Sequence, residues 1–114
     1  MVWHVVAALS GASGVGLGAI GAHRLKNKTE KEKNDWNTAT RYQLIHSLAL
    51  AVLPAYQRSN ARTAAGVLFT SGIILFSGSI YTYILTDNIK MSGAAPLGGM
   101  AFIAGWLSLA LLKR

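Results

Sequence analysis

His46 is the residue whose type and position are best suited to chemistry. It lies ten residues from either end of an apolar stretch that runs from 36 to 56, which places it about 15 Å along a helix from each end. An ionisable side chain at that depth in a bilayer is a candidate functional group. Three roles are open: a neutral imidazole with a hydroxyl partner, proton or ligand handling, and ligation of a cofactor.

Hydroxyl side chains on the apolar stretch 63–85 are the expected partners of His46. A buried polar group must find a hydrogen-bond partner, and Ser77, Ser79 and Tyr81 offer hydroxyls. Tyr42 and Gln43 share the helix face of His46 because they lie four and three residues before it. The sequence therefore predicts an intramembrane polar network with these members: Tyr42, Gln43, His46, Ser77 and Tyr81.

Other reactive constellations are missing from the sequence. The chain has no cysteine, and its apolar stretches contain no Asp or Glu. His4 and His23 lie at opposite ends of the first stretch, so no two histidines share the depth that haem ligation requires. We expect no catalytic residue, no cofactor-binding residue, no metal site and no enzyme activity.

Four apolar stretches must position these residues: 2–22, 36–56, 63–85 and 94–112. Each approaches the roughly 20 residues that a membrane-spanning helix needs. Apolar residues make up 52% of the 114 residues and charged residues 13%, about half the charged share of a soluble domain. The sequence predicts an all-α polytopic membrane protein, in which residues 1–114 form one domain, a compact bundle of four transmembrane helices.

The basic residues lie where a bilayer surface is expected. Every Lys and Arg except Arg41 falls in a connection or in the C-terminal tail, and the net charge is +7. We interpret them as lipid-headgroup contacts rather than a nucleic-acid surface. The two sides carry six and four basic residues, which favours a cytoplasmic or matrix location for the first connection. The expected interface or lipid anchors are His23, Arg24, Trp36, Arg41 and Trp106.

Small residues repeat on one face of the first and fourth stretches. Such faces let helices approach closely in lipid, where packing contacts drive association. The expected helix-packing residues are Gly11, Gly14, Gly18, Gly21, Gly98 and Gly105. Gly14 and Gly18 form a GxxxG pair, which serves a contact within one chain or a homo-oligomer. Thr29 and Glu32 have the spacing of a capping box, which predicts that the second helix begins there.

Short motifs in all four stretches resemble one family. They are GAIGAH (18–23), Trp36, Tyr42, Gln43, HSLAL (46–50), FSGSIY (76–81), PLGG (96–99) and Gly105 with Trp106. Together they resemble the transmembrane protein 256 and bacterial YgdD-like family, and the 46–54 segment is closer to the eukaryotic branch. The resemblance implies a multi-pass membrane protein of unassigned function. It favours the mitochondrial inner membrane, with another organelle or a bacterial plasma membrane as alternatives.

The leading interpretation is a structural or accessory membrane protein. It would pack against membrane lipids and other membrane-protein subunits, and it would bind no nucleic acid. The alternative is a small-solute transporter or channel that uses His46. A transporter of the small multidrug type depends on a membrane-embedded Glu, which is missing from the stretches.

Overall fold

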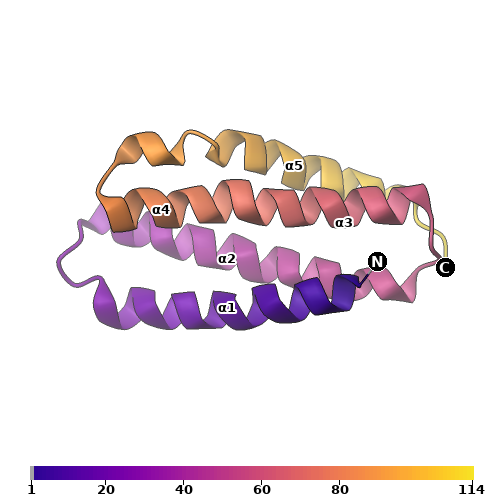
Figure 1. Ribbon diagram of the computed structural model, residues 1–114, viewed down its shortest axis with the longest axis horizontal. Coiled ribbons are helices and arrows are strands. Elements are labelled where there is room, and N and C mark those ends of the chain that lie inside the picture. The colour runs from indigo at the N-terminus through magenta and orange to yellow at the C-terminus, as the bar shows by residue number, and fades with distance from the viewer. Residues whose placement is uncertain (1) are drawn as a thin grey trace.

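The computed structural model describes residues 2–114, which form helices joined by short connections. The helices make four long rods, and consecutive rods run antiparallel (Figure 1). The rods are α1 (Trp3–Arg24); α2 (Glu30–Val52) with the 3₁₀ turn η1 (Leu53–Ala55); α3 (Asn60–Gly72), the π-helical η2 (Ile73–Gly78) and α4 (Ser79–Thr86); and the 3₁₀ turn η3 (Ile89–Ser92), α5 (Ala95–Ser108) and η4 (Leu109–Leu111). No strand occurs in residues 2–114, so the all-α prediction is confirmed.

Local signals set the helix ends. The Thr29 hydroxyl accepts from the Glu32 amide at 3.1 Å, and the Glu32 carboxylate accepts from the Thr29 amide at 3.0 Å, so the predicted capping box is present. Pro54 lies in η1, just after α2 ends. Pro96 lies in the first turn of α5, where a missing amide hydrogen costs nothing. The sequence did not predict the π-helical segment η2.

Consecutive rods make the most extensive contacts. α1 packs chiefly on α2, α2 packs on the rod of α3, η2 and α4, and α5 packs on α3 and η2. α1 and α5 therefore lie at opposite margins of a molecule that measures 48 × 24 × 17 Å (Figure 1). The four rods form a bundle and not a single row, because Trp3 of α1 also packs against Gly66 of α3 and Trp106 of α5 also bonds to His46 of α2.

Three rods are long and apolar enough to cross a membrane: Trp3–Arg24, Asn60–Thr86 and Ile89–Leu111. The rod of α2 is not among them, although we expected a span at 36–56. Its mean hydropathy is low because its first half carries charged and polar residues, including Asn37 and Arg41, and its second half carries the buried Gln43, His46 and Ser47. Ile45, Leu48 and Val52 are exposed apolar side chains of the second half.

Two apolar clusters occupy the two ends of the molecule. Near the chain termini the cluster consists of Trp3, Ala7, Ala49, Leu50, Leu53, Ala65, Phe69 and Phe102. At the other end it consists of Leu25, Trp36, Ala39, Ile80, Tyr81, Tyr83 and Ile84. Buried polar side chains at Gln43, His46 and Ser47 lie between the two clusters along α2. The polar residues therefore form a layer in the middle of the molecule.

Candidate functional site

Gln43 joins three rods through its side-chain amide. Its Nε2 donates to the Ser10 carbonyl at 2.8 Å and to the Ser13 hydroxyl at 3.0 Å, both on α1. Its Oε1 accepts from the Tyr81 hydroxyl of α4 at 2.7 Å. Gln43 is only 4% exposed, and these three bonds pair both amide hydrogens and the amide oxygen inside the protein.

Serine hydroxyls extend this network to both sides of Gln43. The Ser47 hydroxyl lies 2.6 Å from the Ser10 hydroxyl and also donates to the Gln43 carbonyl at 2.6 Å. The Ser77 hydroxyl, on η2, donates to the Ala39 carbonyl of α2 at 2.7 Å. The Ser47–Ser10 and Ser77–Ala39 bonds each set the register of one rod against its neighbour.

His46 belongs to a second group on the other side of α2. Trp106 Nε1 donates to His46 Nε2 at 2.9 Å, and His46 Nδ1 lies 2.6 Å from the Tyr42 carbonyl. An indole N–H only donates, so Nε2 must accept and Nδ1 must carry the proton. Both ring nitrogens of a neutral imidazole are thereby satisfied. The ring also stacks on Phe102 with a centroid distance of 3.6 Å.

The structure divides the predicted polar network into these two groups. It brings together Gln43 and Tyr81, but His46 contacts neither Ser77 nor Tyr81 through a hydrogen bond. Ser79, the other expected partner, donates to the Phe76 carbonyl. Tyr42 serves His46 through its backbone carbonyl, and its side chain is 38% exposed.

Sequence reasoning missed four members: Ser10, Ser13, Ser47 and Trp106. Ser10 and Ser13 lie three residues apart on one helix, and Ser47 lies four residues after Gln43. These spacings indicate that Ser10 and Ser13 share one helix face and that Ser47 shares the face of Gln43. Nothing in the sequence indicated that Trp106 would contact His46.

The expected packing glycines meet different surroundings. A Cβ at Gly21 would lie 2.5 Å from Trp36, a Cβ at Gly14 would lie 2.8 Å from Leu44, and a Cβ at Gly11 would lie 4.0 Å from Ser47. On α5, a Cβ at Gly98 would lie 2.3 Å from the Phe76 backbone nitrogen and one at Gly105 would lie 2.7 Å from Phe69. These close contacts all lie between neighbouring rods of one chain.

Gly18 does not make such a close contact, whereas two glycines that the sequence did not single out, Gly66 and Gly72, do. A Cβ at Gly18 would meet nothing within 4 Å, so this residue makes no close packing contact inside the chain. Gly66 instead receives the ring of Trp3, and Gly72 receives the ring of Phe102, each at 2.3 Å from an added Cβ. The third rod thus uses its glycines to accept large aromatic rings.

Two expected interface anchors have different surroundings. Trp36 is 1% exposed, and its Nε1 donates to the Leu17 carbonyl at 2.7 Å, so it is a core residue that joins α1 to α2. Trp106 is exposed, but its indole N–H donates to His46 and is therefore not directed to a headgroup. His23, Arg24 and Arg41 are exposed, as anchors would be.

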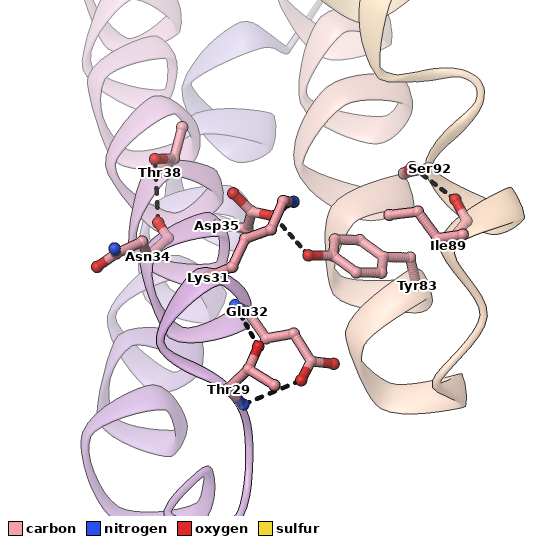
Figure 2. Close-up of polar contacts among 9 residues, drawn as sticks. All are labelled: Thr29, Lys31, Glu32, Asn34, Asp35, Thr38, Tyr83, Ile89 and Ser92. Carbon is pink, nitrogen blue, oxygen red and sulfur yellow. Dashed lines mark hydrogen bonds and ion pairs between the residues drawn. The ribbon is translucent and has the colours of Figure 1, made fainter.

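A charged cluster joins the first and third connections at one end of the molecule. Lys28 donates to Asp87 at 2.8 Å and to the Ile84 carbonyl at 2.9 Å, which ties the first connection to the end of α4. Figure 2 shows the adjoining group, in which Asp35 accepts from Lys31 at 2.7 Å and from the Tyr83 hydroxyl.

Asp35 has a shifted pKa because of these contacts. Partial burial by itself would raise its pKa, but hydrogen bonds from Lys31 and Tyr83 and the Lys31 charge outweigh burial and hold the pKa below its usual value. The hydrogen bond and charge of Asp35 in turn raise the pKa of Lys31. The carboxylate therefore stays ionised at neutral pH.

The pKa of Asp35 predicts an acid-dependent loss of stability. Because the folded-state pKa is lowered, the contribution of this carboxylate is complete above the unfolded value of about 3.9 and is lost as pH falls through the folded value. We expect the wild type to lose about 1 kcal/mol more than Asp35→Asn below about pH 4. Thermal unfolding in detergent from pH 7 to pH 2.5 measures this difference, and parallel curves would contradict it.

Replacing Gln43 by leucine tests the central network. We expect a loss of about 2 kcal/mol in the free energy of unfolding, because three interhelical bonds disappear and the Tyr81 hydroxyl is left unpaired. Unfolding by a denaturing detergent, followed by circular dichroism, measures the loss. Ser13→Ala is the matched control, and it should cost only about 0.6 kcal/mol because one interhelical bond is removed. Equal effects of the two changes would contradict the central role of Gln43.

An aromatic groove adjoins His46 between α2 and α5. It has a volume of about 590 Å³ and is lined by Tyr42, Ile45, His46, Phe76, Pro96, Gly99, Met100, Phe102, Ile103 and Trp106. Its lining is mostly apolar, and both ring nitrogens of His46 are engaged in hydrogen bonds within the protein. Within residues 2–114, no three His, Cys, Asp or Glu side chains are placed to hold a metal ion.

The rods and their internal polar layer define a small helical membrane protein whose buried polar groups are bonded to one another. The chain belongs to the DUF423 family, whose description is "protein of unknown function", and the family matches residues 17–99.

Named relatives agree with this class. A UPF0382 membrane protein of Staphylococcus saprophyticus is 40% identical over 114 residues, with 96% of this chain and 94% of the relative covered. The UPF0382 membrane protein YwdK of Bacillus subtilis is 36% identical, with 95% and 92% covered. A fission yeast relative from Schizosaccharomyces pombe is 34% identical, with 95% and 97% covered. No solved structure matches the chain.

These relatives carry neither the transmembrane protein 256 nor the YgdD name. The resemblance to those proteins therefore stays a prediction, while membership in a membrane protein family of unknown function is established.

Proposed function

We propose that this protein is a structural or accessory membrane subunit that packs against a larger membrane complex. The observation that carries the proposal is the contrast between its inside and its outside. Gln43 and His46 have their polar atoms engaged within the chain, whereas apolar side chains on the outer rods are uncovered, with Leu9 and Leu107 each 70% exposed. What the molecule offers to its surroundings is packing surface.

The outer face of α1 is the proposed contact with a neighbouring subunit. Ala8, Ala12 and Gly16 are exposed and repeat every four residues, and a Cβ at Gly16 would meet nothing within 4 Å. A face of this kind lets the helix of another membrane protein approach closely.

Substitution on this face tests the accessory role. In mild detergent, the native chain should migrate as a complex much larger than 12.1 kDa. Gly16→Leu should release the chain from that complex, whereas Leu107→Trp on α5 should leave it intact. A complex that contains only copies of this chain would replace the accessory role by a homo-oligomer, and a monomeric wild type would overturn both.

Transport of a small solute is the second candidate, because the aromatic groove reaches His46. His46→Leu separates the two functions. If the variant still joins its complex while a solute flux of the wild type is lost, transport is favoured. If assembly fails and the wild type carries no flux, the structural role is favoured. An enzymatic role is not part of the proposal, since no nucleophile and base are paired at His46.

The proposal includes membrane crossing by all four rods. Support comes from α2, whose polar side is covered by its neighbours while Ile45, Leu48 and Val52 are exposed on its outer side. Mean hydropathy combines the polar first half of α2 with its apolar second half, so it does not report how apolar the exposed side of the second half is.

Cysteine labelling tests this topology, because the chain has no natural cysteine. In sealed vesicles with a membrane-impermeant maleimide, Asn27→Cys and Asn88→Cys should be labelled from the same side and Asn60→Cys from the opposite side. If α2 does not cross, Asn27→Cys and Asn60→Cys will share one side, with Asn88→Cys on the other.

The mitochondrial inner membrane remains the proposed location on the strength of the eukaryotic-like 46–54 segment. The named relatives include bacterial membrane proteins, so a bacterial plasma membrane is the alternative. Fractionation of the native source with marker proteins decides between them.

A further inference from the structure

The end of the molecule that carries the C-terminal tail is basic, and no Asp or Glu lies there. The Gln57 backbone amide donates to the Lys113 carbonyl at 2.7 Å, and its side-chain Nε2 donates to the Arg114 carbonyl at 2.7 Å. These bonds bring the C-terminal tail beside the connection that contains Arg58. All Asp and Glu of the chain lie at 30–35 and 87, where Glu30, Asp35 and Asp87 form the ion pairs of Lys33, Lys31 and Lys28.

Arg62 adds a buried cation to this end. It is 8% exposed, and its Nη1 donates to the Tyr56 carbonyl at 2.8 Å. A guanidinium has five N–H donors, and its charge normally meets a carboxylate or a phosphate when it is buried. Arg62 has no carboxylate partner among the ion pairs of residues 2–114. Together with Arg58, Lys113 and Arg114, it forms what we term the basic end.

An apolar groove leads directly to the basic end. It lies between α2 and η4, has a volume of about 230 Å³, and is lined by Ile45, Leu48, Ala49, Val52, Tyr56, Trp106 and Leu109. Tyr56 both lines this groove and supplies the carbonyl that Arg62 contacts. Ile45 and Trp106 also line the aromatic groove beside His46, so the two grooves adjoin at these side chains.

The length of the combined groove matches one leaflet. Tyr56 lies ten residues after His46, which corresponds to about 15 Å along a helix, or about half of a hydrocarbon core roughly 30 Å thick. An acyl chain that enters at the basic end therefore reaches the level of His46.

We propose that this surface binds an anionic phospholipid, with its headgroup phosphate on the basic end and one acyl chain in the α2–α5 groove. Charge complementarity selects the phosphate, and the two adjoining apolar grooves select a lipid over a free anion. The inference goes beyond the accessory role and uses another face, but it rests on the proposal that α2 crosses the membrane. The labelling experiment tests that crossing separately.

Native mass spectrometry of the full chain tests the site. The protein is delipidated in mild detergent and offered phosphatidylglycerol and phosphatidylcholine with identical acyl chains. We expect at least about fivefold more phosphatidylglycerol adduct, because each cation near an anionic headgroup adds attraction. Equal binding of the two lipids would overturn the proposal. So would an equal rise in melting temperature with inorganic phosphate alone, because a free-anion site would then suffice.

Paired variants separate the headgroup contact from the groove. Arg58→Gln with Lys113→Gln should lower phosphatidylglycerol binding about tenfold, whereas Lys26→Gln with Lys90→Gln removes the same charge at the other end and should change it little. Ile45→Trp, which narrows both parts of the groove, should weaken both lipids, whereas Leu107→Trp should not. Equal effects within either pair would overturn the corresponding contact. Because the isolated chain is measured, failure of the accessory role leaves these outcomes unchanged.

Discussion

Replacing Gly98 by alanine should destabilise the protein by about 3 kcal/mol, near the upper end for an overpacked core. The added Cβ would lie 2.3 Å from the backbone nitrogen of Phe76 and 2.8 Å from its Cα. A backbone cannot move aside as a flexible side chain does, so α5 must separate from η2. Loss of helical circular dichroism against the fraction of denaturing detergent measures the change in stability.

Gly99 provides a matched control on the next residue. A Cβ there would meet nothing within 4 Å, so Gly99→Ala changes helix propensity without a clash. It should be neutral or stabilising by up to about 1 kcal/mol. If the two alanine variants lose equal stability, the close contact between α5 and η2 is not the cause.

Replacing Trp36 by alanine should cost about 3–5 kcal/mol, because a buried ring is removed and a cavity remains. Trp36 is 1% exposed and packs 4.7 Å, centroid to centroid, from Tyr81. Its ring also fills the space above Gly21. The same detergent unfolding measurement applies.

Two further variants show how much of this loss comes from the ring and how much from the hydrogen bond of Trp36. Trp36→Phe keeps most of the ring and removes the bond to the Leu17 carbonyl, so it should cost about 1 kcal/mol. Trp106→Ala removes a ring that is 45% exposed and should cost less than Trp36→Ala. If Trp106→Ala loses more stability than Trp36→Ala, the core role of Trp36 is contradicted. The interface role that its sequence position suggested is then favoured.

The order of these effects follows from the solvent around the helices. In lipid, helices gain little from burying apolar surface, so close packing and interhelical hydrogen bonds carry the association. Gly98 provides the closest backbone approach, and Trp36 provides the largest fully buried ring. The polar bonds of Gln43 are individually weaker and serve mainly to set the register of α1, α2 and α4.

Much of this architecture could be predicted from neighbouring residues alone. Long apolar stretches indicated helices in lipid, the Thr29 and Glu32 spacing indicated the start of α2, and glycine spacing indicated the packing faces of α1 and α5. These features depend on helix periodicity and on backbone groups within one turn, so a single segment contains the required information.

The tertiary structure decided which residue meets which. His46 and Trp106 are sixty positions apart, and the hydroxyls of Ser77 and Tyr81 were equally plausible partners by type. Gly14 and Gly18 have the same spacing signal, yet a Cβ would clash only at Gly14. Rod order and rotation determine such contacts, and both arise from many packing interactions between distant segments, which local periodicity does not encode.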